Sequence, residues 1–168
     1  SILGYLIFYV PKFSYIKLRI TAFFDTEHKG NYQSQKATDA IIDGGFFGKG
    51  IGEGTLNTLV PEAHTDYVIS VISEEFGVLL ILIVLLIFLL LIFKVFKKIP
   101  SEKNNSNKLI LIGSILLILF QVLIHIGVNI RFLPTTGMTL PFLSYGGSSI
   151  LSSSILAGLI LNFTRRKI

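Results

Sequence analysis

The sequence predicts an all-α polytopic membrane protein with three complete transmembrane helices, the end of a fourth, a large extracytoplasmic loop and a re-entrant loop. Of its 168 residues, 51% are apolar and 15% are charged, and the mean hydropathy is +0.71. This composition is too apolar for an ordinary soluble domain. The basic residues lie beside apolar runs, as cytoplasmic membrane anchors do. We therefore expect contact with membrane lipid and, despite the net charge of +5, no nucleic-acid partner.

Apolar and polar stretches alternate along the chain and divide it into eight segments. The first ten residues are apolar but too few to span a bilayer, so we interpret them as the tail of a helix and the chain as the C-terminal part of a longer protein. The positive-inside rule makes the lysine-rich turn and the basic tail cytoplasmic. The expected order is the end of a transmembrane helix (1–10), an extracytoplasmic loop (11–65), a transmembrane helix (66–98), a cytoplasmic loop (99–107), a transmembrane helix (108–130), an extracytoplasmic re-entrant loop (131–147), a transmembrane helix (148–164) and a cytoplasmic tail (165–168).

The long polar loop contains two predicted short helices, over residues 15–24 and 35–42. The second of them places Ala37, Ala40 and Ile41 on one side.

The glycine-rich segment 43–54 resembles a phosphate-binding loop only superficially. Gly48 and Lys49 are followed by Gly50, whereas a P-loop requires Ser or Thr there, and the spacing of a dinucleotide-binding loop fails as well. We interpret the glycines as allowing positive φ angles and close backbone packing in a tight segment that helps to shape a substrate cleft.

Residues 66–98 are predicted to form one helix, without charge between Phe76 and Phe93. At about 1.5 Å per residue such a helix is roughly 48 Å long, more than the ~30 Å of hydrocarbon. Its first turns are therefore expected to project into headgroups or a wet cavity. The residues expected to share one face there, with small side chains leaving room beside the carboxylate, are Asp66, Ser70, Ser73 and Gly77.

The second apolar span carries a polar stripe of Gln121, His125 and Asn129, which recur every four residues and are expected to face other helices. A hydrogen-bonded interhelical role for His125 is favoured over a proton relay. The next segment has no charge after Arg131, yet it contains two prolines and three glycines. Such backbone is tolerated at membrane depth only when buried in protein or lining a cavity, so we expect a re-entrant loop beside the Asp66 end.

Five ionisable residues gather where the polar loop meets the first long helix: Glu62, His64, Asp66, Glu74 and Glu75. Carboxylates at the edge of hydrocarbon indicate function by default, and the competing interpretation is a solvated helix end in which Thr65 or Asp66 acts as an N-cap. Glu74 and Glu75 are expected to pair with bases. No metal site is predicted, because the chain has no cysteine and no zinc motif has the spacing of Glu62, His64 and Asp66.

Three long motifs resemble the SEDS family of FtsW, RodA and SpoVE, and most closely its FtsW branch. Pro-Glu-Ala-His-Thr-Asp-Tyr at 61–67 with Glu-Glu-Phe-Gly at 74–77 resembles one family signature. Gly-Val-Asn-Ile at 127–130 resembles a second, and the whole of 133–149 resembles a third. Thr136 departs from the usual lysine of that branch, and Arg131 stands where an apolar residue or glycine is usual.

The resemblance implies a peptidoglycan glycosyltransferase that polymerises lipid II during cell division, in the bacterial inner membrane and at the division septum. It implies a class B penicillin-binding transpeptidase and other division proteins as partners, and Asp66 as the catalytic base. A divalent cation, Lys49 or Arg131 is a candidate to stabilise the leaving diphosphate. The residues implied to bind substrate are Glu62, His64, Thr65, Lys49, Ser144, Tyr145, Gly146 and Gly147.

Two other functions fit the same residues. The first is a transporter that flips lipid II, because transporters use intramembrane polar residues as relays. The second is an inactive fragment that serves as a scaffold for division proteins.

Overall fold

The computed structural model describes residues 29–165, which contain helices and no strand. The predicted end of a fourth span (1–10) and the predicted helix at 15–24 lie outside these residues. The elements are α3 (Lys29–Gly44), α4 (Leu56–Leu59), α5 (Ala63–Asp66), α6 (Val68–Phe76), α7 (Val78–Lys98), the 3-10 helix η2 (Ile99–Ser101), α8 (Asn105–Asn129) and α9 (Gly147–Thr164).

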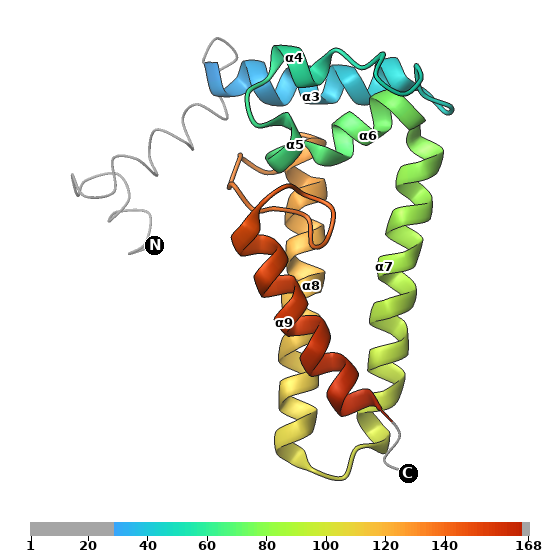
Figure 1. The fold of residues 1–168 in the computed structure, drawn as a ribbon, viewed down its shortest axis with the longest axis vertical. Helices are drawn as coiled ribbons and strands as arrows, with labels where there is room; N and C mark the ends of the chain where they lie inside the picture. The colour runs from blue at the N-terminus through green and yellow to red at the C-terminus, as the bar shows by residue number, and fades with distance from the viewer. Residues whose placement is uncertain (1–28, 166–168) are drawn as a thin grey trace, which may run out of the picture.

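Three of these helices are long and apolar enough to cross a membrane, namely α7 extended by η2, α8 and α9. The prediction of three spans in an all-α polytopic membrane protein is therefore confirmed. The four shorter helices α3 to α6 gather beyond one end of the long ones, where α7 begins and α8 ends (Figure 1). The predicted helix at 35–42 exists within the longer α3, and its Ala37 and Ala40 are buried.

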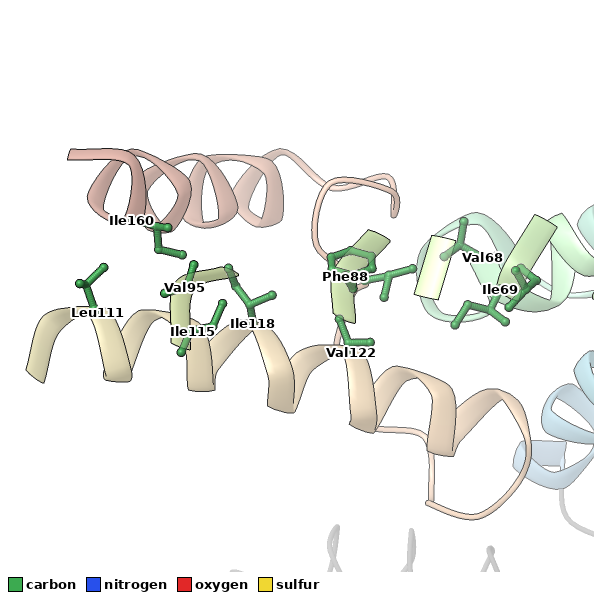
Figure 2. Packing of buried hydrophobic residues seen from close by; sticks show 11 residues of the cluster. Val68, Ile69, Phe88, Val95, Leu111, Ile115, Ile118, Val122 and Ile160 are labelled. Atoms are coloured by element: carbon green, nitrogen blue, oxygen red, sulfur yellow. The ribbon is translucent and has the colours of Figure 1, made fainter. Parts of the chain in front are cut away.

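The three long helices pack through large aliphatic side chains and one aromatic ring. Val95 of α7 lies beside Ile115 and Ile118 of α8, Phe88 of α7 lies beside Val122 of α8, and Ile160 of α9 belongs to the same cluster (Figure 2). In a bilayer the lipid tails are as apolar as these side chains, so the cluster holds the helices together by van der Waals packing. The turn between α7 and α8 is closed by Asn104, whose side-chain oxygen accepts a hydrogen bond from Ser106 N at 2.9 Å and caps α8.

The prediction of one helix over 66–98 is wrong, because the helix breaks at Gly77. This residue has φ 85° and ψ 167°, outside the helical region and accessible mainly to glycine. A Cβ atom at this position would lie 2.2 Å from the carbonyl oxygen of Phe46. The chain therefore turns at Gly77, and α6 runs across the end of α7 and does not extend it (Figure 1).

The glycine-rich segment packs its backbone directly on α6 and on the start of α7. The amides of Lys49 and Gly50 donate to the carbonyls of Glu74 and Glu75 at 2.8 and 3.0 Å. The amide of Val78 in turn donates to the carbonyl of Gly45 at 2.9 Å. The interpretation of these glycines as a device for positive φ angles and close packing is confirmed.

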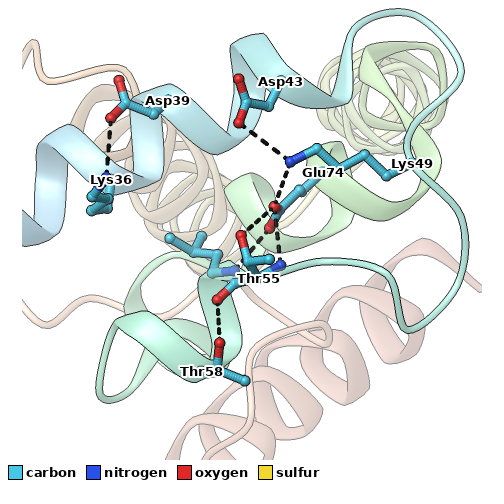
Figure 3. A network of polar contacts seen from close by, with 8 residues as sticks. Lys36, Asp39, Asp43, Lys49, Thr55, Thr58 and Glu74 are labelled. Carbon is cyan, nitrogen blue, oxygen red and sulfur yellow. Dashed lines mark hydrogen bonds and ion pairs between the residues drawn. The ribbon is translucent and has the colours of Figure 1, made fainter.

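Glu74 is a buried charge that joins the glycine-rich segment to α6. Its side chain is 2% exposed, and one oxygen, Oε1, accepts hydrogen bonds from Lys49 Nζ, Thr55 N and Thr55 Oγ1, each at 3.0 Å. The other oxygen, Oε2, accepts from Leu56 N at 3.0 Å (Figure 3). Lys49 also donates to Asp43 at 3.2 Å. The expectation that Glu74 pairs with a base is confirmed.

These contacts set the ionisation of the pair. Burial of Glu74 opposes its negative charge, but the hydrogen bonds from the amides of Thr55 and Leu56, from Lys49 and from the Thr55 hydroxyl outweigh it and lower the pKa of this carboxyl. The hydrogen bond to Glu74 likewise raises the pKa of Lys49. A lowered folded-state pKa contributes stability above the ordinary value of 4.5, and that stability is lost as the pH falls through the folded-state pKa.

We expect Glu74→Gln to lower the free energy of unfolding by about 3 kcal/mol at pH 7, because it leaves Lys49 and three donors without a charged acceptor. The difference from the native protein should shrink below pH 4.5, the ordinary pKa of a glutamate. The thermal unfolding midpoint of the detergent-solubilised protein, measured at pH 7 and over a series of pH values below 4.5, tests both effects. Glu75→Gln is the matched control at the next position, and equal losses in the two variants would contradict the assignment.

We expect Gly77→Ala to destabilise the protein by about 1–3 kcal/mol, because alanine is strained at positive φ and its Cβ meets the Phe46 carbonyl. Gly113→Ala is the control: this glycine lies inside α8 with no atom near its missing Cβ. Alanine there improves helix propensity and should not lower the unfolding midpoint. A Gly77→Ala variant as stable as the native protein would show that the break at this residue is dispensable.

Candidate functional site

The segment that carries Asp66 is held from one side by the end of the 131–147 loop. Ser144 Oγ donates to the carbonyl of Thr65 at 2.8 Å and accepts from Leu140 N at the same distance. Tyr145 N donates to the carbonyl of His64 at 3.2 Å. The rings of His64 and Tyr145 meet edge to face, with centroids 5.8 Å apart. The prediction that this loop lies beside the Asp66 end is therefore confirmed.

The turn that opens α5 is made by Glu62, whose φ of 62° lies in the left-handed region. Its carbonyl accepts hydrogen bonds from Thr65 N, Thr65 Oγ1 and Asp66 N at 2.9, 2.8 and 3.1 Å. A non-glycine residue at positive φ is uncommon, and such strain clusters at functional sites. The interpretation of Thr65 or Asp66 as an N-cap is wrong, since Glu62 and Tyr67 occupy the N-cap positions of α5 and α6.

Asn129 holds the same segment from the membrane side. Its amide nitrogen donates to the carbonyls of Asp66 at 3.2 Å and His125 at 2.8 Å. Its oxygen accepts from Ser70 N at 3.1 Å and from Ser70 Oγ at 2.7 Å. All hydrogen-bonding capacity of this fully buried amide is thus used between α8 and the chain around Asp66.

The polar stripe on α8 faces the protein interior, as predicted. His125 is fully buried, and its Nδ1 lies 3.0 Å from the carbonyl oxygen of Met138. His125 is therefore hydrogen-bonded, as the favoured structural role predicts. Its partner belongs to the 131–147 loop and not to another helix. Within residues 29–165, Gln121 Oε1 and His125 Nε2 are buried without a hydrogen-bond partner.

Ser70 and Ser73 do not leave open space beside Asp66, and this prediction is wrong. Both are buried, at 0% and 1% exposure. Ser70 is bound to Asn129, and the backbone of Ser73 lies against Gly44, where a Cβ would be 2.1 Å from the Ser73 carbonyl oxygen. The small side chains serve close helix packing instead, because the break at Gly77 turns their face toward α3 and α8.

One side of the site is exposed to solvent. Glu62, His64 and Tyr145 are exposed, and Asp66 is half-buried between them and the interior. Of the residues predicted to bind substrate, the structure therefore joins Ser144 and Tyr145 to the Asp66 segment, which also contains Glu62, His64 and Thr65. Gly146 and Gly147 follow Tyr145 directly in the chain, at the start of α9.

Lys49 and Arg131 have other surroundings. Lys49 is held by Glu74 and Asp43, and no hydrogen bond or ion pair within residues 29–165 joins it to the Asp66 segment. Arg131 follows α8 with φ 58°. No group of three His, Asp or Glu side chains able to hold a metal exists in the described part of the chain. These residues alone do not fit a protein-held divalent cation.

Tyr67 was not predicted as part of the site. It is 2% exposed, and its hydroxyl has no partner among residues 29–165. Burial, with a contribution from the nearby charge of Asp66, raises the pKa of this phenol to about 12. The SEDS signature that residues 61–67 resemble has Phe at the position of Tyr67. The extra hydroxyl at this apolar position is the sequence signal that could have identified the residue.

Comparison with known proteins gives a consistent family. The model of the family of FtsW, RodA and SpoVE, described as "Cell cycle protein", matches residues 2–167. The chain is similar to the probable peptidoglycan glycosyltransferase FtsW of Caulobacter vibrioides, with 34% identity over 92% of this chain and 40% of that protein. It is also similar to the proteins of the same name from Enterococcus hirae, with 40% identity over 86% and 37%, and Synechocystis, with 38% identity over 90% and 39%.

A solved structure described as "Structural coordination of polymerization and crosslinking by a peptidoglycan synthase complex" matches with a TM-score of 0.67. The sequence identity is 27%, and the match covers 99% of this chain and 48% of that chain. The chain thus spans about two-fifths of the length of the curated relatives it matches. This chain belongs to the family of FtsW, RodA and SpoVE, and it is most like FtsW.

Proposed function

We propose that this chain provides the Asp66 site of a peptidoglycan glycosyltransferase that polymerises lipid II during cell division. One observation carries the proposal: a half-buried aspartate whose backbone is held by side chains of two separate elements, Asn129 and Ser144, in a chain whose relatives are named as peptidoglycan glycosyltransferases. A site held on rigid elements is what positioning of a reacting group requires.

The chemistry assigns Asp66 the role of general base. A sugar hydroxyl attacks the anomeric carbon that is linked to undecaprenyl diphosphate, so one carbon–oxygen bond forms and the bond to the diphosphate breaks. The proton of the attacking hydroxyl moves to the Asp66 carboxylate, and the diphosphate leaves with the electron pair. The half-buried position of Asp66 lets this carboxylate meet a substrate while part of its surroundings excludes water.

The neighbouring residues are proposed to bind and position the substrate. His64 and Tyr145 offer exposed rings at the edge of the site, and Glu62 offers an exposed carboxylate. Thr65 and Ser144 act through the backbone, because their side chains hold the turn and the loop in place. Gly146 and Gly147 leave the backbone at the start of α9 open to the substrate. Arg131 remains a candidate to stabilise the leaving diphosphate, whereas Lys49 is engaged with Glu74.

The proposal extends to partner and location. The matched synthase structure concerns polymerisation together with crosslinking, which supports a class B penicillin-binding transpeptidase as partner beside other division proteins. We place the protein in the bacterial inner membrane at the division septum, with Asp66 and the 131–147 loop on the outer face. The basic turn at 99–107 and the basic tail then lie on the cytoplasmic side, in agreement with the positive-inside rule.

The structure gives less support to a lipid II transporter. The motivation for that function was the polar stripe on α8, but Asn129 and His125 are buried and bound to Ser70 and to backbone carbonyls. Such contacts favour helix packing over the passage of a substrate. No observation specifically favours an inactive scaffold.

We expect Asp66→Asn to reduce the rate of lipid II polymerisation by about 10²–10⁴, the usual contribution of a general base. The assay is the formation of glycan strands from lipid II by the purified protein together with its transpeptidase. Asp39→Asn, the same chemical change on the exposed surface of α3, is the control and should retain activity. Polymerisation by Asp66→Asn at the native rate would refute the assigned role.

We expect Ser144→Ala to lower kcat more than it raises KM, because it removes the hydrogen bond that fixes the Thr65 carbonyl next to Asp66. A decrease of about tenfold corresponds to the loss of one or two hydrogen bonds near 1 kcal/mol each. Ser148→Ala, which changes an exposed serine one turn later, is the matched control. A change in KM alone would show that Ser144 binds substrate directly and does not position Asp66.

A further inference from the structure

Two adjoining cavities lie between the long helices at the end opposite Asp66. The larger, of about 770 Å³, is mostly apolar and is lined by Leu91, Val95, Ile118, Ala157, Ile160 and Leu161 from all three helices. The smaller, of about 660 Å³, is polar and is lined by Ser101, Lys103, Asn107, Asn162 and Arg165. Lys98 lines both cavities, and Lys94 lines the apolar one. An apolar cavity and a basic one therefore meet at Lys98.

The charges around these cavities are unbalanced. Four bases line them, namely Lys94, Lys98, Lys103 and Arg165, against the single acid Glu102. Glu102 accepts hydrogen bonds from Asn104 N and Asn107 Nδ2, both at 3.3 Å. Within residues 29–165, none of the four bases forms an ion pair. Unpaired bases at the edge of hydrocarbon attract anions, and basic pockets between transmembrane helices bind anionic lipid headgroups.

The spacing of the two lysines suits a ligand with a charged head and an apolar body. Lys94 and Lys98 are four residues apart and so share one face of α7. Long lysine side chains lay their methylene stems along apolar surface and carry the ammonium group to the headgroup level. A phosphate at Lys98 would leave an attached acyl chain facing the aliphatic wall of Val95, Ile118 and Ile160.

We propose that α7, α8 and α9 bind one anionic phospholipid, with its phosphate against Lys98, Lys103 and Arg165 and its acyl chains in the apolar cavity. A further protein helix is a less suitable occupant, because it would have to supply several acids at one end to balance the four bases. The apolar cavity reaches Phe142 of the 131–147 loop, but the bases proposed to bind the phosphate lie at the end of the long helices opposite Asp66. The proposal does not depend on the proposed catalytic function.

The test is native mass spectrometry of the protein as its own gene encodes it, titrated in detergent with dioleoyl phosphatidylglycerol or dioleoyl phosphatidylcholine. We expect one phosphatidylglycerol to be retained at a concentration about tenfold lower than phosphatidylcholine. The double variant Lys98→Gln with Lys103→Gln should remove this preference, since each base near an anionic headgroup contributes a several-fold gain in affinity. The matched control is the double variant Lys97→Gln with Lys108→Gln, which also removes two positive charges. These lysines line neither cavity, so the control should keep the preference for phosphatidylglycerol.

A second variant tests the apolar half of the site without changing charge. Ala157→Phe fills the apolar cavity and should lower retention of the lipid about tenfold, since it removes the space for the acyl chain. The unfolding midpoint in phosphatidylcholine nanodiscs verifies that each variant is folded. Three outcomes would each overturn the proposal. The native protein could retain both lipids equally, or the two double variants could have the same effect. The native protein could also retain no lipid because protein occupies the cavity.

Discussion

The Asn129 amide is the contact on which the position of the candidate site depends. It lies at the last residue of a membrane-crossing helix and binds the carbonyls of Asp66 and His125 and both donors of Ser70. A buried amide with a missing partner costs about 1–3 kcal/mol, so the four contacts are maintained together or lost together. Helix α8 thereby fixes the position and orientation of α5 and α6. Ser144 and Tyr145 then bind a segment that Asn129 already holds in place.

The break at Gly77 makes that arrangement possible. Had α6 continued the axis of α7, the carbonyl of Asp66 and the amide of Ser70 would have been engaged in one straight helix and directed away from α8. Because the chain turns, α6 presents Ser70 to Asn129 on one side and Glu74 to the glycine-rich segment on the other. A glycine at positive φ and a buried carboxylate therefore serve the same purpose, which is to hold a short helix across the end of the spans.

The sequence was sufficient to predict whatever depends on composition and on periodicity. The three spans follow from long uncharged runs, and the burial of His125 and Asn129 follows from their four-residue spacing. The placement of Asp66 beside the 131–147 loop followed from counting spans, and it is confirmed by the contacts of Ser144. Gly77 was misread because a lone glycine fits a helical face as well as a break; only the approach of Phe46, from a distant segment, decides between the two. The same applies to Lys49, whose partner Glu74 is 25 residues away.

The charged side chains at the two ends of the helical bundle differ in whether they have partners within this chain. Near Asp66, the buried carboxylate of Glu74 is fully satisfied by donors of this chain, so that end can be rigid without any ligand. At the other end, four bases and one acid line the two cavities, and none of the four bases forms an ion pair within residues 29–165. Self-repulsion among those bases would loosen the helix ends unless an external anion offsets it. The membrane itself supplies such anions, which makes lipid a structural component at one end while the chemistry is reserved for the other.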